Sequence, residues 1–506
     1  FVSCVSQHGG GDGAYKDRAI QYLDPRGRNE MVRDGGRYFY LRDDESGEFW
    51  SPGWHPAQAP LDHFQCTHGL GYSIIEGRRS GITARLRVFV PTDVPCEVWT
   101  VTIANESDRD RGLRFYSFVD WLLMGCPRYC DYFATLFGER YEDLNAVQCC
   151  NRAAERTHPV FDGFIASSRT LTGWETSRRA FLGNFGHVNR PEAVAAGRLP
   201  GTLASCENLA GVLEHTVELP PGECETFHVF IGASSGYEMT RGIVAPLMRN
   251  GAVDRAFEQV RDAKQAMVDR LTIRTPDEKL NHLINNWIKQ QVQIYADVGS
   301  DNGRGFRDAM QLLWATAGYD QPYTRRMLVE CLSHQFSDGH TLRGWLPIDD
   351  HHYSDGPVWI APVVDAYIKE SGDFAFLDHE VAFFEEGVGT IWEHVLRGLR
   401  HCCEDVGEHG LVRMHFGDWN DSLTGIGIEG RGESVWTSMG IVYGLRIAAD
   451  MARRVRQDDA VADELLRRAG DLTAAINEHG WDGRWYLRAI NDYGEKVGTH
   501  TEAEGF

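Results

Sequence analysis

The sequence predicts a β + α multidomain fold. It comprises an antiparallel β-sandwich over residues 1–236, a helical linker over 237–275 and the first part of an (α/α)6-type barrel over 276–506. Two features predict this order. The first part contains short runs of alternating apolar and polar residues separated by Gly, Pro, Asn and Asp, which is typical of antiparallel strands. The last part repeats its apolar residues with the period of an α-helix and separates its helices with long loops.

Strands in the first part are predicted from an alternation with a period of two. The stretches Ala84–Val90 and Glu97–Ile103 both alternate apolar with polar residues, and Pro91 separates them. Such alternation is expected of a strand with one buried face. Phe227–Ile231 is predicted as the last strand, whereas residues 145–210 are expected to leave the sheet because their pattern is less regular.

Helices in the last part are predicted from apolar stripes with a period of 3.6 residues. The first stripe comprises Leu280, Leu283, Ile284, Trp287, Ile288, Val292 and Tyr295. Six further helices are expected over residues 308–319, 322–335, 357–371, 388–404, 434–455 and 459–478. A closed barrel of helix pairs needs about twelve helices, so these roughly seven predict a barrel that is incomplete in this chain. Since the chain also begins at Phe1 without a leader-like segment, we expect a protein truncated at both ends.

The composition restricts the class of protein. Lysine and arginine number 51 and acidic residues 73, so the formal net charge is 51 − 73 = −22. Binding of nucleic acid or anionic membrane needs a basic surface, which this balance argues against. No apolar run reaches the roughly 18 residues of a membrane span, and 12 cysteines in 506 residues are too few for a disulfide scaffold. We therefore expect a cytoplasmic protein with reduced thiols and without nucleic-acid or membrane partners.

The segment Gly417–Asp421, with the sequence GDWND, is the strongest candidate for a catalytic loop. It combines two carboxylates, an amide and an indole within five residues. Glycosyl transfer needs a carboxyl group that protonates the departing glycosidic oxygen and an aromatic plane that supports the apolar face of a sugar. The alternative is a solvent-exposed loop, or a cap for the helix that is predicted to begin near Ser434.

The segment Gly303–Asp308 contains three charged side chains, Arg304, Arg307 and Asp308. An adjacent arginine and aspartate at a helix start can bind neighbouring sugar hydroxyls, because one donates and the other accepts hydrogen bonds. The alternative is a capping aspartate with a surface arginine. The glycine spacing does not indicate a dinucleotide site, since no βαβ pattern surrounds it.

The segment Asp349–Trp359 contains two adjacent histidines, His351 and His352, and the carboxylate of Asp355. Histidines beside acidic residues can indicate a metal site. Adjacent side chains point in different directions, however, and no third ligand follows at metal spacing, so no metal is predicted. The favoured interpretation is a loop that contacts sugar, with Asp355 as its candidate residue.

Eight of the motifs along the chain resemble those of one family of enzymes. In the first part they are YKD (Tyr15–Asp17) followed by Arg18, GGRYFYLRDDESGEFWSPGWHP (Gly35–Pro56), HGLGYSIIEG (His68–Gly77) and AFLGNFG (Ala180–Gly186). In the last part they are GFRD (Gly305–Asp308), HHYSDGPVW (His351–Trp359), GDWND (Gly417–Asp421) and GESVW (Gly432–Trp436). By the order and spacing of these motifs, the chain resembles glycoside hydrolase family 94 over nearly its full length. This family comprises the inverting cellobiose, cellodextrin and chitobiose phosphorylases and their relatives.

The resemblance implies roles for several residues. Asp421 would be the general acid, Trp419 would lie in the donor subsite, and Asp308 would bind hydroxyls of the same glucosyl unit. The family also has an arginine six residues before this last aspartate. This chain has an asparagine there, so Arg304 or Arg307 is expected to take the role. The family's phosphate-binding residues fall mostly in the second half of the barrel and are not assigned here.

The activity that the resemblance implies is inverting phosphorolysis of a β-linked gluco-disaccharide or oligosaccharide to α-glucose 1-phosphate. Inorganic phosphate is the co-substrate, no cofactor is needed, and a homodimer is expected. The acid must hold its proton, which a dry, aromatic-lined pocket around Asp421 would favour. Two alternatives stay open. One is an inverting β-glycoside hydrolase in which a second carboxylate, such as Glu433, activates water, and the other is an inactive sugar-binding fragment of such an enzyme.

Overall fold

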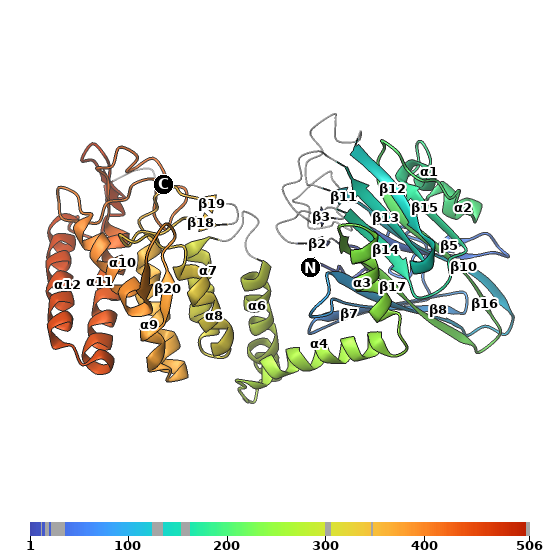
Figure 1. The fold of residues 1–506 in the computed structure, drawn as a ribbon, viewed down its shortest axis with the longest axis horizontal. Coiled ribbons are helices and arrows are strands. Elements are labelled where there is room, and N and C mark those ends of the chain that lie inside the picture. Colours follow the sequence, from blue (N-terminus) through green and yellow to red (C-terminus); the bar gives the residue numbers. More distant parts are fainter. Residues whose placement is uncertain are drawn as a thin grey trace. The chain divides into compact units, whose positions relative to one another are not determined.

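The computed structural model describes residues 1–11, 13–15, 20–21, 36–123, 135–152, 162–298, 305–345 and 348–501 (Figure 1). The chain forms two compact units, Phe1–Ala266 and Met267–Phe506. The first unit is built mainly from antiparallel strands and the second mainly from helices. The predicted fold class, a sheet domain followed by a helical domain, is therefore confirmed.

The first unit contains two large antiparallel sheets. An eight-stranded sheet has the order β12-β13-β14-β17-β9-β8-β7-β6, and a five-stranded sheet has the order β15-β16-β10-β4-β5. The strands of the first are β6 (His63–Gly69), β7 (Tyr72–Arg79), β8 (Ile82–Phe89), β9 (Cys96–Asn105), β12 (Leu136–Tyr141), β13 (Ala146–Asn151), β14 (Asp162–Ser167) and β17 (Cys224–Ser234). Those of the second are β4 (Arg37–Asp43), β5 (Phe49–Trp50), β10 (Arg111–Asp120), β15 (Gly173–Ser177) and β16 (Leu209–Leu219). A small four-stranded sheet adds β1 (Val2–Ser3), β2 (Gly13–Tyr15), β3 (Ile20–Gln21) and β11 (Leu122–Leu123).

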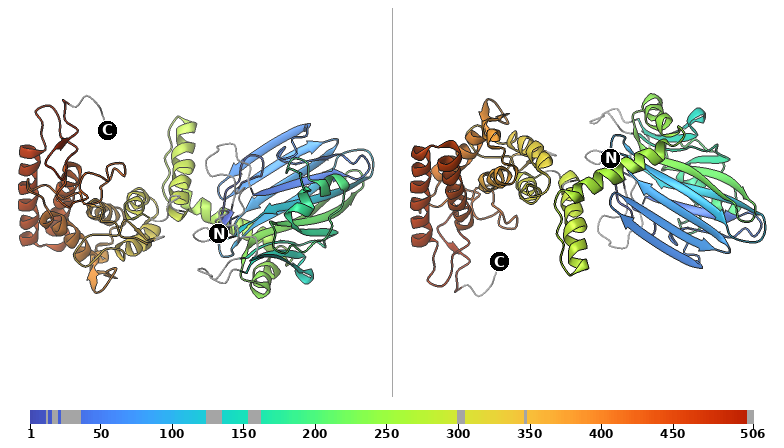
Figure 2. Two further views of the ribbon diagram at one scale, coloured as in Figure 1. Left: turned by 90° about the horizontal axis from the view of Figure 1, so that it is seen from above. Right: turned by 90° about the horizontal axis from the view of Figure 1, so that it is seen from below.

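The core of the first unit lies between the two large sheets. Apolar side chains from one face of each sheet form a single buried cluster, which includes Leu41, Leu86, Trp99, Phe115 and Leu213. Figure 2 shows the blue strands of the eight-stranded sheet side by side. The strands predicted over 84–90 and 97–103 are β8 and β9, and the last predicted strand lies within β17.

The prediction that residues 145–210 leave the sheet is wrong for the first part of this segment. Strands β13 and β14 are inner strands of the eight-stranded sheet, and β14 pairs with β17 along six residue pairs from Asp162↔Ser234 to Ser167↔Val229. All six residues of each strand are buried, so neither strand shows the alternation that the search for strands relied on. The later part of the segment holds two short helices, α1 (Arg178–Leu182) and α2 (Glu192–Ala196).

Two helices follow the last strand of the first unit. They are α3 (Tyr237–Leu247) and α4 (Ala252–Asp269), which together cover most of the predicted linker. Ile243 and Val244 of α3 and Val260 of α4 belong to a buried cluster with Phe89 and Phe230 of the eight-stranded sheet. These helices therefore bury the sheet face that points away from the main core.

The second unit is a series of helices joined by long loops. They are α5 (Glu278–His282), the π-helical η3 (Leu283–Ile288), α6 (Lys289–Val298), α7 (Phe306–Thr316), α8 (Gln321–Leu332), α9 (Ile360–Ser371), α10 (Ile391–Glu404), α11 (Val435–Met451), the π-helical η6 (Ala452–Arg456) and α12 (Asp459–His479). Short turns η4 (Gly356–Trp359) and η5 (Phe374–Asp378) lie between them. Three small sheets lie in the loops, formed by β18 (Gly344–Trp345) with β19 (Ile348–Asp349), by β20 (Glu380–Ala382) with β21 (Val388–Thr390), and by β22 (Glu433–Ser434), β23 (Ala489–Ile490) and β24 (Lys496–Val497).

Capping side chains explain where several of these helices begin. Thr390 and Glu393 form a capping box at α10, and Asp320, Ser434 and Asp458 each accept a backbone N–H at the start of α8, α11 and α12. The six helices predicted between residues 308 and 478 correspond to α7 to α12, within a few residues at each end. A continuous apolar core joins these helices.

Four side chains of the first predicted apolar stripe are exposed. Leu280, Leu283, Trp287 and Ile288 are 40%, 42%, 54% and 41% exposed, and they lie outside the core that α7 to α12 share. The helix that this stripe predicts is nevertheless present, as α5, η3 and α6. Among the described residues, none of the helices combines the length and the hydropathy that a membrane crossing requires.

Candidate active site

The start of α7 is joined to the loop between α8 and α9. The backbone N–H of Phe306 donates to the carbonyl of Arg343 at 2.9 Å, and Gly305 pairs with Gly344 in a β-bridge. The strand pair β18–β19 continues from this bridge, as Figure 1 shows beside α7. Backbone hydrogen bonds therefore fix the position of the Arg307-Asp308 pair on the first turn of the helix.

A second set of backbone contacts joins the histidine-containing loop to the GDWND loop. Tyr353 forms β-bridges with both His415 and Gly417, and the backbone N–H of Phe416 donates to the carbonyl of His352 at 3.0 Å. A Cβ at Gly417 would lie 2.9 Å from the ring of Tyr353, so only glycine fits at this crossing. The loops that carry Asp355 and Asp421 thus lie side by side.

Arg307 links these loops through its side chain. Its Nη2 donates to both carboxylate oxygens of Asp421, at 3.0 and 3.1 Å. Its Nη1 donates to the backbone carbonyls of Asp418 and Trp419, at 3.2 and 3.0 Å, and lies 3.4 Å from Oδ2 of Asp355. With a side chain that is only 15% exposed, Arg307 is not the surface arginine of the alternative interpretation.

Asp421 is open to solvent. Its side chain is 53% exposed, and a second guanidinium, that of Arg343, lies 3.8 Å from its Oδ1. The dry, aromatic-lined pocket that the sequence led us to expect is absent around this carboxylate among the described residues. The reason is that two arginines and solvent, instead of apolar side chains, surround the end of the loop.

Asp418, three residues earlier, has the opposite environment. It is completely buried, and its Oδ2 accepts a hydrogen bond of 2.6 Å from the hydroxyl of Ser434. Its Oδ1 accepts the backbone N–H of Asn420 at 3.1 Å and pairs with Arg488. Ser434 in turn caps α11, so Asp418 anchors the loop to the start of this helix.

Asp355 is buried behind Arg307. Its side chain is 3% exposed, and Nε1 of Trp359 donates to its Oδ2 at 3.3 Å. Burial raises the pKa of Asp355 to about 6, although Arg307 and Trp359 act in the opposite direction. Asp355, which was predicted to contact sugar, is thus buried and contacts Arg307 instead. Asp308 is more accessible, with a side chain that is 37% exposed.

Three indoles form a row that begins at Trp419, two residues before Asp421 in the sequence. The ring of Trp419 stacks on that of Trp436 with centroids 5.9 Å apart and an interplanar angle of 26°, and Trp359 lies 6.0 Å beyond Trp436. Trp419 is 48% exposed, so the outer face of the row is open to a ligand. An exposed aromatic face can support the apolar face of a sugar ring.

The structure thus brings together five of the six predicted site residues, namely Arg307, Asp308, Asp355, Trp419 and Asp421. Arg304 and the asparagine at position 302 lie outside the described residues. The sequence interpretation missed Arg343, Arg488 and Trp436. Of these, only Trp436 carried a local signal, since it follows the capping Ser434 within the GESVW motif.

Glu433, the predicted base of the hydrolase alternative, is already occupied. It is 2% exposed and accepts the backbone N–H groups of His409 and Leu411 at 3.1 Å each. Nδ1 of His409 lies 2.5 Å from its other oxygen. Three donors therefore fix this carboxylate within the loop that follows α10.

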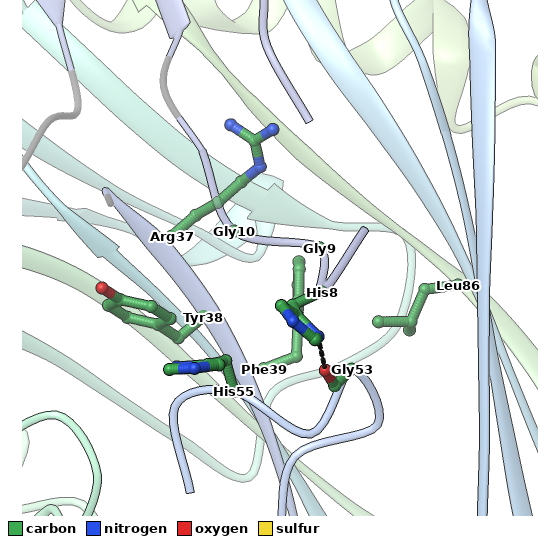
Figure 3. A pocket seen from close by; sticks show the side chains of 9 residues that line it. All are labelled: His8, Gly9, Gly10, Arg37, Tyr38, Phe39, Gly53, His55 and Leu86. Atoms are coloured by element: carbon green, nitrogen blue, oxygen red, sulfur yellow. Dashed lines mark hydrogen bonds between the residues drawn. The ribbon is translucent and has the colours of Figure 1, made fainter. Parts of the chain in front are cut away.

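The first unit has a small hollow of its own near its N-terminal end (Figure 3). His8, Arg37, Phe39 and His55 are among the residues that line it, and Nδ1 of His8 lies 2.8 Å from the carbonyl oxygen of Gly53. None of the predicted site residues lines this hollow. The convergence of carboxylates, arginines and exposed indole in the second unit makes that unit the better candidate for chemistry.

Comparison with known families agrees with this assignment. Residues 1–249 match the glycosyl hydrolase 94 supersandwich domain, and residues 264–506 match the catalytic domain of the glycosyl hydrolase 94 superfamily. The chain belongs to glycosyl hydrolase family 94. Asp421, Asp308, Arg307 and Trp419 all lie in the part that matches the catalytic domain.

Several curated members of the family resemble the whole chain. A solabiose phosphorylase of Paenibacillus borealis is 48% identical over 507 residues, which cover 100% of this chain and 66% of that protein. An N,N'-diacetylchitobiose phosphorylase of Vibrio furnissii is 28% identical over 549 residues, which cover 100% of this chain and 68% of that protein. The chain thus spans about two thirds of the length of these relatives.

A solved structure shows the same fold. A bacterial glucoamylase complexed with acarbose superimposes with a TM-score of 0.54 over 96% of this chain and 70% of its own. The two sequences are only 10% identical, so this similarity concerns the fold alone.

Proposed function

We propose that this chain carries the acid-bearing part of an inverting phosphorylase that acts on a β-linked disaccharide or oligosaccharide and releases an α-glycosyl 1-phosphate. The observation that carries the proposal is the position of Asp421, because Arg307 contacts both of its carboxylate oxygens and also the backbone carbonyl of Trp419, whose side chain is exposed in the same loop. The membership of the family and the phosphorylase names of its curated relatives support the same reaction.

The proposed reaction is a single displacement. A phosphate oxygen forms a bond to the anomeric carbon while the bond from that carbon to the glycosidic oxygen breaks, and Asp421 gives its proton to this departing oxygen. Phosphate is already an anion, so no protein base is needed. Trp419 would support the sugar ring, and Asp308 and Arg307 would bind its hydroxyls.

The contacts of Arg307 set a condition on this mechanism. Both carboxylate oxygens of Asp421 accept hydrogen bonds from Arg307, and the oxygen that carries the proton loses one of its acceptor positions. We therefore expect the contacts between Arg307 and Asp421 to rearrange when the substrate binds. The other contacts of Arg307, to the loop carbonyls and to Asp355, can hold the guanidinium in place during this exchange.

The surroundings favour phosphorolysis over hydrolysis. An inverting hydrolase needs a second free carboxylate that activates water. Glu433 is occupied by three donors, and Asp418 is buried against Ser434 and Arg488. Neither carboxylate can approach a water molecule on the sugar without leaving the hydrogen bonds that hold its own loop.

The test is an assay of the protein with and without inorganic phosphate. Solabiose and cellobiose are the first substrates, because one relative is named for solabiose and the family includes cellobiose phosphorylases. We expect sugar 1-phosphate to form only when phosphate is present. Equal release of free monosaccharide in both arms would overturn phosphorolysis in favour of hydrolysis, and binding of sugar without either product would indicate a sugar-binding fragment.

A further inference from the structure

Four imidazoles and two carboxylates gather behind the two loops of the candidate active site. His401 lies in α10 and Asp405 just after it, while His352 and His415 lie in the loops that carry Asp355 and Asp421. His340 and Asp338, from the turn after α8, complete the group. The rings of His352 and His415 stack with centroids 4.0 Å apart and an interplanar angle of 11°.

Three members of this group converge on one point. A ring nitrogen of His352, a ring nitrogen of His401 and a carboxylate oxygen of Asp405 all lie within 4.8 Å of one another. Tetrahedral ligands at about 2.0–2.1 Å from a zinc ion lie about 3.4 Å apart. The three atoms would therefore move together by at most about 1.4 Å to reach zinc-binding distances.

The two ring nitrogens of His401 have different surroundings. Its Nδ1 lies 3.8 Å from Oδ2 of Asp338, whereas its Nε2 is buried and has no hydrogen-bond partner among the described residues. A ligating histidine commonly donates its other ring N–H to a carboxylate, which leaves one nitrogen for the metal. An unpartnered buried nitrogen costs stability unless a ligand uses it.

Asp405 also contacts a side chain outside the group of three, that of His415. Nε2 of His415 lies 2.5 Å from Oδ2 of Asp405. His415 adopts a left-handed backbone conformation with φ of +54°, which is uncommon for a residue other than glycine. The contact with Asp405 and the stacking on His352 hold this strained residue in place.

We propose that His352, His401 and Asp405 bind a divalent transition-metal ion of the zinc class, with His415 and Asp338 as outer partners. Water or His340, whose ring centroid lies 5.0 Å from that of His352, would complete four ligands. The ion would tie α10 to both loops of the candidate active site. It is thus a structural site, and the inference does not depend on the proposed reaction.

A second acidic and histidine group, Asp349 with Asp350 and His351, does not qualify. Nδ1 of His351 already lies 2.6 Å from Oδ1 of Asp349, and the side chain of His351 is 56% exposed. Since His351 and His352 are neighbours in the sequence, His351 is the matched control for His352.

The test is a zinc titration of the protein after dialysis against a chelator. We expect one zinc ion per chain by elemental analysis, a higher Tm with zinc than with magnesium, and visible absorption of a tetrahedral site when cobalt(II) is added instead. His352→Ala and Asp405→Asn should each weaken zinc binding by more than about 100-fold. His415→Gln, which removes an outer partner, should weaken it by about 10–100-fold.

The control variants make the result decisive. His351→Ala should bind zinc like the wild type, and far-UV circular dichroism should show that every variant is folded. Asp405→Asn keeps the shape of the side chain, so it tests the site even if an alanine variant fails to fold. Failure of the wild type to retain zinc, or equal loss of zinc in His351→Ala and His352→Ala, would overturn the proposal.

Discussion

The two units of the molecule use the same pair of side chains, an arginine and a carboxylate, in opposite ways. In the sandwich, Arg37 pairs with Glu97 at 3.3 Å, and both side chains are 0% exposed. In the helical unit, Arg307 holds Asp421, whose side chain is 53% exposed. In the buried pair, the carboxylate of Glu97 also accepts hydrogen bonds from the hydroxyl of Ser3 and from Nε1 of Trp99, whereas the exposed Asp421 can exchange its partner. Exposure, more than residue type, therefore distinguishes a carboxylate that is available for chemistry from one that stabilises the fold.

The largest effect is expected when the exposed acid, Asp421, is replaced. We expect Asp421→Asn to lower kcat by at least about 100-fold, because a positioned general acid contributes about 10²–10⁴-fold to a rate. The free energy of unfolding should change by less than about 0.5 kcal/mol, as is usual at exposed positions. Steady-state kinetics and thermal unfolding measure the two quantities.

The matched control is Asp471→Asn on α12. Asp471 is also exposed, at 69%, and also pairs with an arginine, Arg467. It should leave both kcat and stability unchanged. If Asp421→Asn retained more than about a tenth of the wild-type kcat, Asp421 would not be the acid.

The second prediction concerns the buried acid of the sandwich, Glu97. We expect Glu97→Gln to lower the free energy of unfolding by about 3–5 kcal/mol, because it removes the negative charge that faces the buried guanidinium of Arg37. Glu45→Gln is the control, since Glu45 is 68% exposed in its pair with Arg109 and such pairs contribute at most about 1 kcal/mol. Urea unfolding of both variants measures this difference. An equal loss of unfolding free energy in Glu97→Gln and Glu45→Gln would contradict it.

A third prediction concerns Asp418, the buried aspartate of the GDWND loop. Asp418 is buried and paired with Arg488, which is 22% exposed. We expect Arg488→Met to destabilise the helical unit by about 2–3 kcal/mol, because the hydroxyl of Ser434 and one backbone N–H then remain as the partners of a buried carboxylate. Hydrogen exchange should show faster opening of the loop 417–421, and unchanged exchange there would refute the anchoring role of Asp418.

The smallest expected effect concerns pH and Asp355. Burial raises the pKa of Asp355 from its ordinary value of 3.8 to about 6, so the native state binds this proton more tightly than the unfolded state does. The contribution of this group to stability is therefore fully present below about pH 4 and is lost as the pH rises to about 6. Asp355→Asn cannot lose a proton, so its stability relative to the wild type should rise by about 1–3 kcal/mol between pH 4 and pH 7. Unfolding at these two pH values measures this difference, and a constant difference would contradict the raised pKa.

The parts of the fold that local patterns determine could be predicted from the sequence. The period of 3.6 residues located α7 to α12, and the alternation located β8 and β9. Strands β13 and β14 were missed because both of their faces are buried, which removes the alternation. The local pattern carries no information on which distant strand covers the second face.

The candidate site shows the same limit. The sequence pointed to GDWND and to the Arg307-Asp308 pair, and Arg307 does contact Asp421. It could not show which of the two carboxylates in GDWND is buried, because that depends on Arg488, 70 residues further along the chain. The sequence also did not predict that His401 and Asp405 lie close to His352, since this proximity comes from the fold and not from their spacing in the sequence.

The row of three indoles has an optical consequence. Trp419 is half exposed and stacks on Trp436, which in turn lies close to Trp359. An indole in contact with water emits at longer wavelength than one that is covered. A sugar ring that settles on Trp419 would therefore shift the intrinsic fluorescence to shorter wavelength, so occupancy of the site can be followed without a label or turnover.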